Sequence, residues 1–253
     1  MKHKIRNLVI VLGFILLWQI ISCNVNPLFL PSPVKVFENF VILLKNGMLI
    51  QSAIKSFIRI TLATMITCTI SLPLAFIMYG NKFINNTISP ITNLLRYLPI
   101  TAFYPLLILW VGINEEMKIT FLFCATFFYF LPSILLCIKE VDERLIDTGY
   151  TMGMNKFQVI TKIVLPYTLP SICQNILMMY GIGWTYIVVA EMTNATKGLG
   201  YIINIGSARG RTDMVFMAIL SIMIISYIVD KLGNKLIEKT FKWKFKKEEI
   251  DQC

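Results

Sequence analysis

The residues whose types and spacing could do chemistry lie in a polar segment, residues 139–170, and at one acidic position, Glu191. The segment gathers acids, bases, two glycines and two prolines between long apolar runs. A bilayer interior excludes such a segment, because backbone groups and charges must be satisfied there without water. We therefore predict a structured, amphipathic loop in the cytoplasm. A carboxylate at membrane depth, as expected for Glu191, indicates a role in handling a solute or an ion.

The polar segment has the local signals of two short helices. Residues 145–152 continue a helical pattern, and Gly153 can end it because glycine adopts the left-handed conformation without strain. Asn155 can cap a second helix, with Gln158 completing a capping box. Pro166 lacks an N–H group, so we expect it to end or kink that helix.

No arrangement of side chains predicts catalysis. The only histidine, His3, lies in a basic N-terminal segment, and the sequence contains no zinc-protease helix motif, nucleophile elbow or P-loop. The six cysteines form no C-x-x-C pair and lie mostly in apolar runs, which favours small buried side chains over metal or disulfide use. We expect neither an enzyme nor a cofactor on this chain.

The composition indicates an all-α membrane protein. Hydrophobic residues make up 56% of the 253 residues, charged residues only 15%, and the mean hydropathy is +0.68. A net charge of +10 could indicate nucleic-acid binding, but the basic residues gather at helix ends and in the tail. Membrane topology explains that distribution better, so no nucleic-acid partner is expected.

The apolar runs predict six transmembrane helices. The expected spans are residues 8–21, 56–79, 94–111, 119–138, 171–190 and 214–229. Pro99 and Pro105 should break the third span, Arg59 should snorkel at the outer end of the second, and residues 80–92 should form a short polar turn. The domain organisation is then a first helix in 1–23, an extracytoplasmic connection in 24–52, a transmembrane domain in 53–232 that contains the loop 139–170, and a basic tail in 233–253.

Basic residues set the expected orientation. Most lysines and arginines lie in the N-terminal segment, the 139–170 loop and the tail, which the positive-inside rule assigns to the cytoplasm. Both termini of a multi-pass protein of the inner, cytoplasmic membrane are therefore expected inside. The first apolar run could also be a cleaved signal peptide, or a lipoprotein signal ending at Cys23, but the following spans favour a retained helix.

The loop resembles the "EAA" loop of permease subunits in binding-protein-dependent ABC importers. Asp147 stands at the glutamate position, Thr148 and Gly149 at the two alanine positions, and Gly153 at the glycine position. The spacing from Gly153 to Leu165-Pro166 also agrees with the family pattern. The resemblance implies a type I ABC importer permease (MetI-like) fold, a homodimer in membrane lipid, and a loop that docks on a separate ATPase subunit. ATP would bind that ATPase, and an extracytoplasmic solute-binding protein would deliver the solute.

Two further phrases resemble this family, Leu30-Pro-Ser-Pro33 and Tyr104-Pro-Leu-Leu-Ile-Leu-Trp110-Val-Gly112. Val189-Ala-Glu-Met192 and Gly198-Leu-Gly-Tyr201 resemble a signature of its sulfonate, nitrate and taurine branch, which also handles thiamine-precursor-like compounds. We expect Tyr104, Trp184 and Glu191 to lie in the translocation path or at an outer gate. The alternatives are aromatic anchors at the membrane interface and a Glu191 that pairs with Arg209 or Arg211 at a helix end.

Two other classes of function remain as alternatives. A stand-alone secondary transporter or channel would need an intramembrane relay of ionisable residues or an inverted repeat, and the sequence shows neither. A membrane scaffold or assembly factor that transports nothing is the third reading. The sequence favours an importer permease that couples a separate ATPase to the passage of a solute and does not itself catalyse a reaction.

Overall fold

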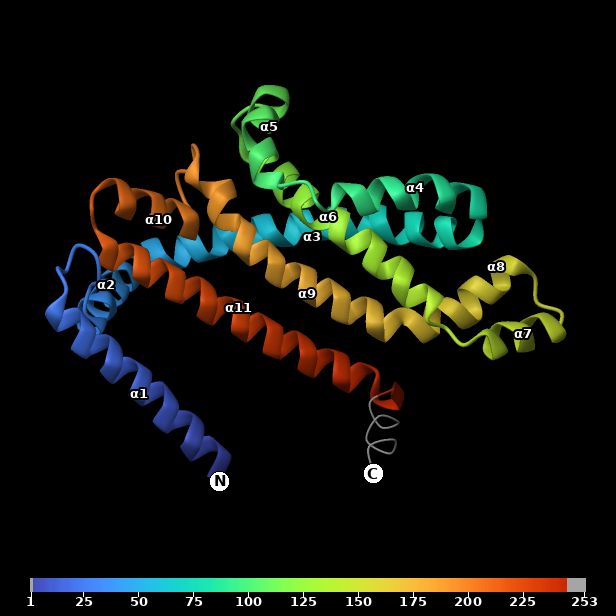
Figure 1. The fold of residues 1–253 in the computed structure, drawn as a ribbon, viewed down its shortest axis with the longest axis horizontal. Helices are drawn as coiled ribbons and strands as arrows, with labels where there is room; N and C mark the ends of the chain where they lie inside the picture. The colour runs from blue at the N-terminus through green and yellow to red at the C-terminus, as the bar shows by residue number, and fades with distance from the viewer. Residues whose placement is uncertain (1, 245–253) are drawn as a thin grey trace. The chain divides into compact units, whose positions relative to one another are not determined.

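The computed structural model describes residues 2–244, so Met1 and residues 245–253 of the predicted basic tail lie outside the described residues. Every regular element within 2–244 is helical, as predicted (Figure 1). The chain divides into two compact units, which are described separately. The first contains Met1–Ile58 and Val188–Ile225, and the second contains Arg59–Ile187 and Ser226–Cys253.

Four helical segments of residues 2–244 are long and apolar enough to cross a membrane. They are α3 (Met48–Gly80), α6 (Glu115–Lys139), the continuous helix Lys156–Met192 and α11 (Thr212–Thr240). The predicted spans 56–79, 119–138, 171–190 and 214–229 each fall inside one of them. Helix α11 continues to Thr240, so the first part of the predicted tail is helical.

The region predicted as an inner turn and a third span has a different structure. Residues 80–92 contribute to a helix, α4 (Lys82–Leu95), whose N-terminus is capped by the Asn81 side chain through the N–H groups of Phe83 and Ile84. The predicted turn is therefore wrong, because the polar residues lie on one face of an amphipathic helix. After Pro99 the chain forms η1 (Ile100–Phe103) and α5 (Tyr104–Val111), and the two helical segments meet at 87°. The predicted break at Pro99 is confirmed, whereas Pro105 lies in the first turn of α5 and does not interrupt it.

The N-terminal region contains two helices. Helix α1 (Lys2–Asn24) carries an apolar stretch, Val9–Asn24, that is shorter than the four long spans. Helix α2 (Pro33–Lys45) begins after Ser32, whose hydroxyl accepts from the Lys35 N–H. The bent pair raises the number of spans to five, and a sixth requires α1 to cross as well.

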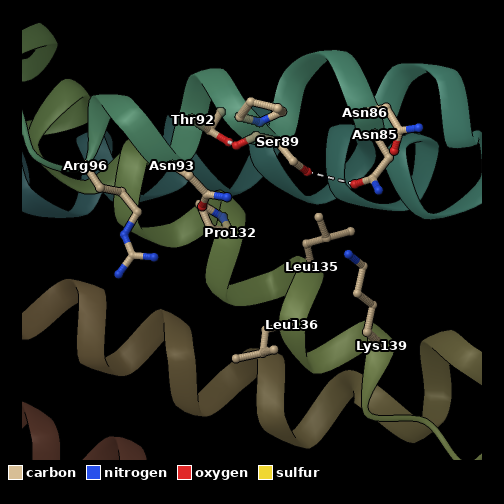
Figure 2. Close-up of a pocket in the computed structure, with 11 residues that line it drawn as sticks. Asn85, Asn86, Ser89, Thr92, Asn93, Arg96, Pro132, Leu135, Leu136 and Lys139 are labelled. Carbon is tan, nitrogen blue, oxygen red and sulfur yellow. Dashed lines mark hydrogen bonds between the residues drawn. The ribbon is translucent and has the colours of Figure 1, made fainter.

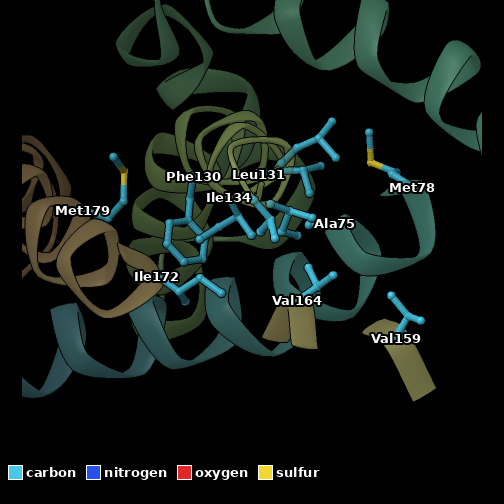
Figure 3. Close-up of a cluster of buried hydrophobic side chains, with 12 residues drawn as sticks. Ala75, Met78, Phe130, Leu131, Ile134, Val159, Val164, Ile172 and Met179 are labelled. Carbon is cyan, nitrogen blue, oxygen red and sulfur yellow. The ribbon is translucent and has the colours of Figure 1, made fainter. Parts of the chain in front are cut away.

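The second unit has a continuous hydrophobic core (Figure 3). Ala75 and Met78 of α3 and Ile134 of α6 pack with Val159 and Val164, which belong to the polar segment. This shared core joins the polar segment to α3 and α6.

Pro166 does not end the second helix of the polar segment. Helix α8 (Lys156–Val159) passes through a π-helical turn, η2 (Ile160–Val164), into α9 (Leu165–Met192). In this turn the Leu165 N–H donates to the Ile160 carbonyl, five residues back. The wider register accommodates a proline, which has no N–H and whose ring crowds the carbonyl four residues earlier. Of the two outcomes predicted at Pro166, an end or a kink, the end is therefore wrong.

Candidate functional site

The polar segment contains a helix that stops as its sequence predicts. Helix α7 (Glu143–Thr151) is capped at its start by Asp142, whose carboxylate accepts from the Arg144 N–H at 2.9 Å. At its end Gly153 has φ +81°, its N–H donates to the Tyr150 carbonyl, and the Met154 N–H donates to the Gly149 carbonyl. These bonds form a Schellman motif, so the predicted glycine stop is confirmed.

The second helix of the segment begins with the predicted capping box. The Asn155 side chain accepts from the Gln158 N–H, and the Gln158 side chain accepts from the Asn155 N–H, both at 2.9 Å. The two reciprocal bonds satisfy donors that a helix start otherwise leaves open. They fix the direction in which α8 leaves the turn at Gly153.

Gly149 explains one departure from the family pattern. It is buried, and a Cβ atom there would lie 2.5 Å from Cδ1 of Ile163 and 3.3 Å from Cγ2 of Val159. The absence of a side chain therefore lets α7 pack closely on α8 and η2. Thr148, at the other alanine position, is exposed and donates to the Arg144 carbonyl at 2.7 Å.

The outer surface of this segment offers both charge and apolar area. Asp147 is exposed, and so are the large side chains of Met152 and Phe157, each more than two-thirds accessible. Pro166 is exposed and Leu165 is half-buried. Large exposed apolar side chains next to acids and bases are typical of a protein docking surface.

The segment is also bonded to the end of α3. The Lys156 ammonium donates to the Gly80 carbonyl, and Ile160 lies next to Gly80. With Val159 and Val164 in the core, this bond connects α8 and η2 to α3 and α6 within the second unit.

Glu191 occupies a second site, in the first unit. Its carboxylate is fully buried and lies 2.8 and 2.9 Å from the Ser56 hydroxyl, and it accepts from the Gly200 N–H at 2.8 Å. The Ser56 oxygen in turn accepts from the Leu199 N–H at 2.9 Å. Glu191 thus holds the start of α10 (Leu199–Ala208), whose N–H groups favour a negative charge.

The glycines beside Glu191 permit this arrangement. Gly198 has φ +142°, and a Cβ atom there would lie 2.2 Å from a Glu191 carboxylate oxygen. A Cβ at Gly200 would lie 2.9 Å from the Val188 carbonyl oxygen. The Gly-Leu-Gly phrase is therefore required for α10 to approach the carboxylate.

Of the two arginines considered as partners of Glu191, Arg209 and Arg211, the structure gives side-chain contacts for Arg211. Arg211 donates to Asn39 at 2.6 Å and to the Asp213 carboxylate at 3.2 Å. The Asn39 amide also donates to Asp213, at 2.6 Å. Arg211 therefore contributes to a polar cluster between α2 and the start of α11.

The two predicted aromatic residues both pack inside the second unit. Tyr104 is buried against Phe121, edge to face, with ring centroids 5.1 Å apart. Trp184 is 2% exposed, and its indole N–H has no hydrogen-bond partner within residues 2–244. A buried donor without a partner is rare in folded proteins.

One charged cluster was not predicted. Arg59, expected to snorkel, is buried and binds Glu115 through two nitrogens, each 2.7 Å from a carboxylate oxygen. The buried Lys118 ammonium lies 3.0 Å from Glu115. The snorkelling prediction is wrong because a carboxylate on α6 reaches the guanidinium. The signal in the sequence is the Glu115-x-x-Lys118 spacing, which places both side chains on one helix face.

Solved structures share this fold. The inward-facing methionine ABC transporter MetNI has a chain that matches with a TM-score of 0.68 at 18% identity, over 77% of this chain and 97% of that one. An amino acid ABC transporter crystallised with histidines matches with a TM-score of 0.61 at 18% identity, over 80% and 97%. The fold is therefore that of an ABC importer permease.

Sequence comparisons give the family. The model of the binding-protein-dependent transport system inner membrane component matches residues 68–242. The taurine transport system permease protein TauC of Escherichia coli (strain K12) is 30% identical over 228 residues, 88% of this chain and 82% of that protein. The putative aliphatic sulfonates transport permease protein SsuC of Bacillus subtilis (strain 168) is 29% identical over 232 residues, 91% and 84%. The chain belongs to the binding-protein-dependent permease family.

Family membership confirms the predicted class of function. The chain is a multi-pass permease subunit of an ABC importer in the inner membrane, and the family implies a separate ATPase subunit and a solute-binding protein as partners. It is not an enzyme, since ATP hydrolysis belongs to the ATPase subunit. A stand-alone transporter is not favoured.

Proposed function

We propose that this permease imports a small organic sulfonate, with taurine as the first compound to test. The carrying observation is the similarity to the taurine permease, which extends over 88% of this chain and 82% of that protein. The similarity to the aliphatic sulfonate permease covers a comparable share of both chains. Nitrate and thiamine-precursor-like compounds are the other solutes of the predicted branch.

The loop 139–170 is, in this proposal, the contact with the ATPase. Its capped helices α7 and α8 give it a fixed shape, and Asp147, Met152 and Phe157 offer a mixed polar and apolar surface. The bond from Lys156 to Gly80 and the shared core support transmission of movement to α3 and α6. Gly149, Gly153 and the Leu165-Pro166 junction maintain the shape rather than contact the partner.

The proposal includes the predicted topology. Both termini and the 139–170 loop lie in the cytoplasm, 24–52 lies outside, 53–232 forms the permease domain and 233–253 extends from it. The distribution of lysines and arginines supports this orientation. Two copies form a homodimer in membrane lipid around one translocation path.

Two roles follow for the remaining predicted residues. Trp184 and Tyr104 border the path, where the free indole N–H of Trp184 can donate to a passing solute. Glu191 fixes the start of α10 near the outer end of α9. Its contribution to an outer gate is to keep α10 in place, and it does not contact the solute.

Reconstitution tests the proposal directly. The chain, its ATPase and its binding protein are placed in vesicles, and ATP-driven uptake of radiolabelled taurine is measured. Gly153→Trp and Asp147→Lys should each abolish most uptake and weaken recovery of the ATPase. Lys82→Gln, on a helix outside the loop, is the control that should leave both unchanged. Uptake without the ATPase would instead indicate a stand-alone transporter.

A further inference from the structure

A polar cavity lies between α4 and α6 in the second unit (Figure 2). Its volume is about 420 Å³, within the range of pockets that hold small molecules. Asn85, Ser89, Thr92 and Arg96 line it from α4, and Lys139 lines it from the end of α6. None of its lining residues is acidic.

The polarity of α4 is arranged around this cavity. Asn85, Ser89, Thr92 and Arg96 recur every three or four positions, so these four residues occupy one face of the helix. The opposite side of α4 carries Phe83 and Leu94, both more than two-thirds exposed. An apolar outer face suits lipid, whereas the polar face of α4 is turned toward the cavity.

The charge of the cavity is positive. Figure 2 shows the Lys139 ammonium pointing from α6 toward α4, with Arg96 at the other end of the cavity. Arg96 lies against the Tyr129 ring at 5.9 Å, and neither cation forms an ion pair within the described part of the chain. Ser89 donates to Asn85 at 2.8 Å, which leaves the Asn85 amide group free to donate.

The cavity lies at the end of the second unit that carries the 139–170 loop. Lys139 is the last residue of α6, directly before the loop, and α4 starts two residues after Gly80, the acceptor of the Lys156 bond. Together these features describe a polar, cationic cavity beside the start of the 139–170 loop.

We propose that this cavity binds the oxyanion group of a small solute, with Arg96 and Lys139 as the charged contacts and Asn85 and Ser89 as polar ones. The inference rests on the proposed import of a sulfonate and assigns that solute an inner binding site. The phosphate of an anionic lipid headgroup has the same chemistry, and the experiment distinguishes these two sources of the oxyanion.

Equilibrium binding to the permease–ATPase complex in phosphatidylcholine nanodiscs, without binding protein, tests the site. Radiolabelled taurine is the probe, with methanesulfonate and ethylamine as competitors that represent its two halves. Methanesulfonate should compete and ethylamine should not. Arg96→Gln combined with Lys139→Gln should weaken binding by about tenfold or more, since charge-assisted hydrogen bonds are lost. Ser89→Leu, which keeps both charges and narrows the cavity, should also weaken it.

Lys82→Gln removes a cation from the same helix outside the cavity and should bind as the wild type does. Equal binding by the wild type and the double variant, or displacement by ethylamine, would overturn the site. Retention of phosphatidylglycerol by the wild type and its loss from the double variant, seen by native mass spectrometry without competition by methanesulfonate, would support the oxyanion site and assign it to a headgroup.

This binding experiment and the uptake experiment in vesicles together separate this proposal from the proposed function. Taurine uptake by the full importer together with unchanged binding in the double variant would remove only the cavity. Failure of taurine uptake together with binding of methanesulfonate that depends on Arg96 and Lys139 would remove only the choice of taurine.

Discussion

Two glycines with positive φ, Gly153 in the loop and Gly198 beside Glu191, hold their regions in shape for different reasons. A Cβ at Gly153 would meet nothing within 4 Å, so only its φ of +81° requires glycine. Gly198 has φ +142° and also lies against the Glu191 carboxylate, where a Cβ would be 2.2 Å from an oxygen. The loop is shaped by local backbone rules, whereas the Glu191 site depends on contacts between residues far apart in the sequence.

The largest expected effect comes from Gly198→Ala. It combines backbone strain with a clash against a buried carboxylate, so we expect a loss of about 3 kcal/mol or more in stability. The thermal midpoint in detergent measures it. Gly112→Ala, at φ +92° with nothing within 4 Å, carries the backbone strain alone and should cost clearly less. Equal losses in the two variants would contradict the close approach to Glu191.

The next effect concerns Arg59, a buried cation held by Glu115. Arg59→Ala removes the guanidinium that binds Glu115. Because Glu115 is exposed to solvent, we expect the free energy of unfolding to fall by only about 2 kcal/mol. Arg59→Lys keeps the charge but loses the two-pronged contact, so it should restore only part of the stability. A snorkelling Arg59 would instead make both variants as stable as the wild type.

A smaller effect on stability is expected at Gly153. Gly153→Ala should cost about 1–2 kcal/mol in the loop, because an L-residue is disfavoured in the left-handed conformation. Gly153→Asn should cost less, since asparagine tolerates that region. ATP-driven uptake should fall in the same order, more for alanine than for asparagine. Full uptake with both would show that the Schellman turn is not needed for coupling.

The smallest effect is expected from the capping box. Asn155→Ala removes one of its two bonds and should destabilise α8 by about 1 kcal/mol. Faster amide hydrogen exchange should appear in Lys156–Val159 and not in α7. Thr151→Ala, a nearby exposed change, serves as the control. Unchanged exchange in α8 would mean that the core contacts of Val159 alone hold it.

Local features of this fold could be predicted from the sequence. The stop at Gly153 and the box at Asn155 depend on residues within a few positions of one another, and both are present. The N-cap preference of asparagine also applies at Asn81, which caps α4. Applied there, it would have predicted a helix in 80–92 in place of a turn. The helix through Pro166 was also missed, because a π turn depends on the packing of Val164 in the core.

The long-range contacts could not be predicted. Glu191 was identified from its depth and its family phrase, but the Ser56 hydroxyl and the Gly200 N–H reach it only in the folded first unit. Arg59 and Glu115 are similarly distant in sequence, so nothing local connects them. Charges in apolar helices indicate that a partner is needed without showing which residue provides it.

The central claim is that the α7–α8 loop of this permease contacts a separate ATPase. A photo-crosslinking amino acid is placed at Phe157, 74% exposed in the loop, or at Phe29, 72% exposed in the predicted outer connection. The tagged chain is purified gently from its own host, and crosslinked partners are identified by mass spectrometry. We expect a P-loop ATPase crosslinked from Phe157 and not from Phe29. A chain recovered without any ATPase, or an ATPase crosslinked equally from both positions, would contradict the account.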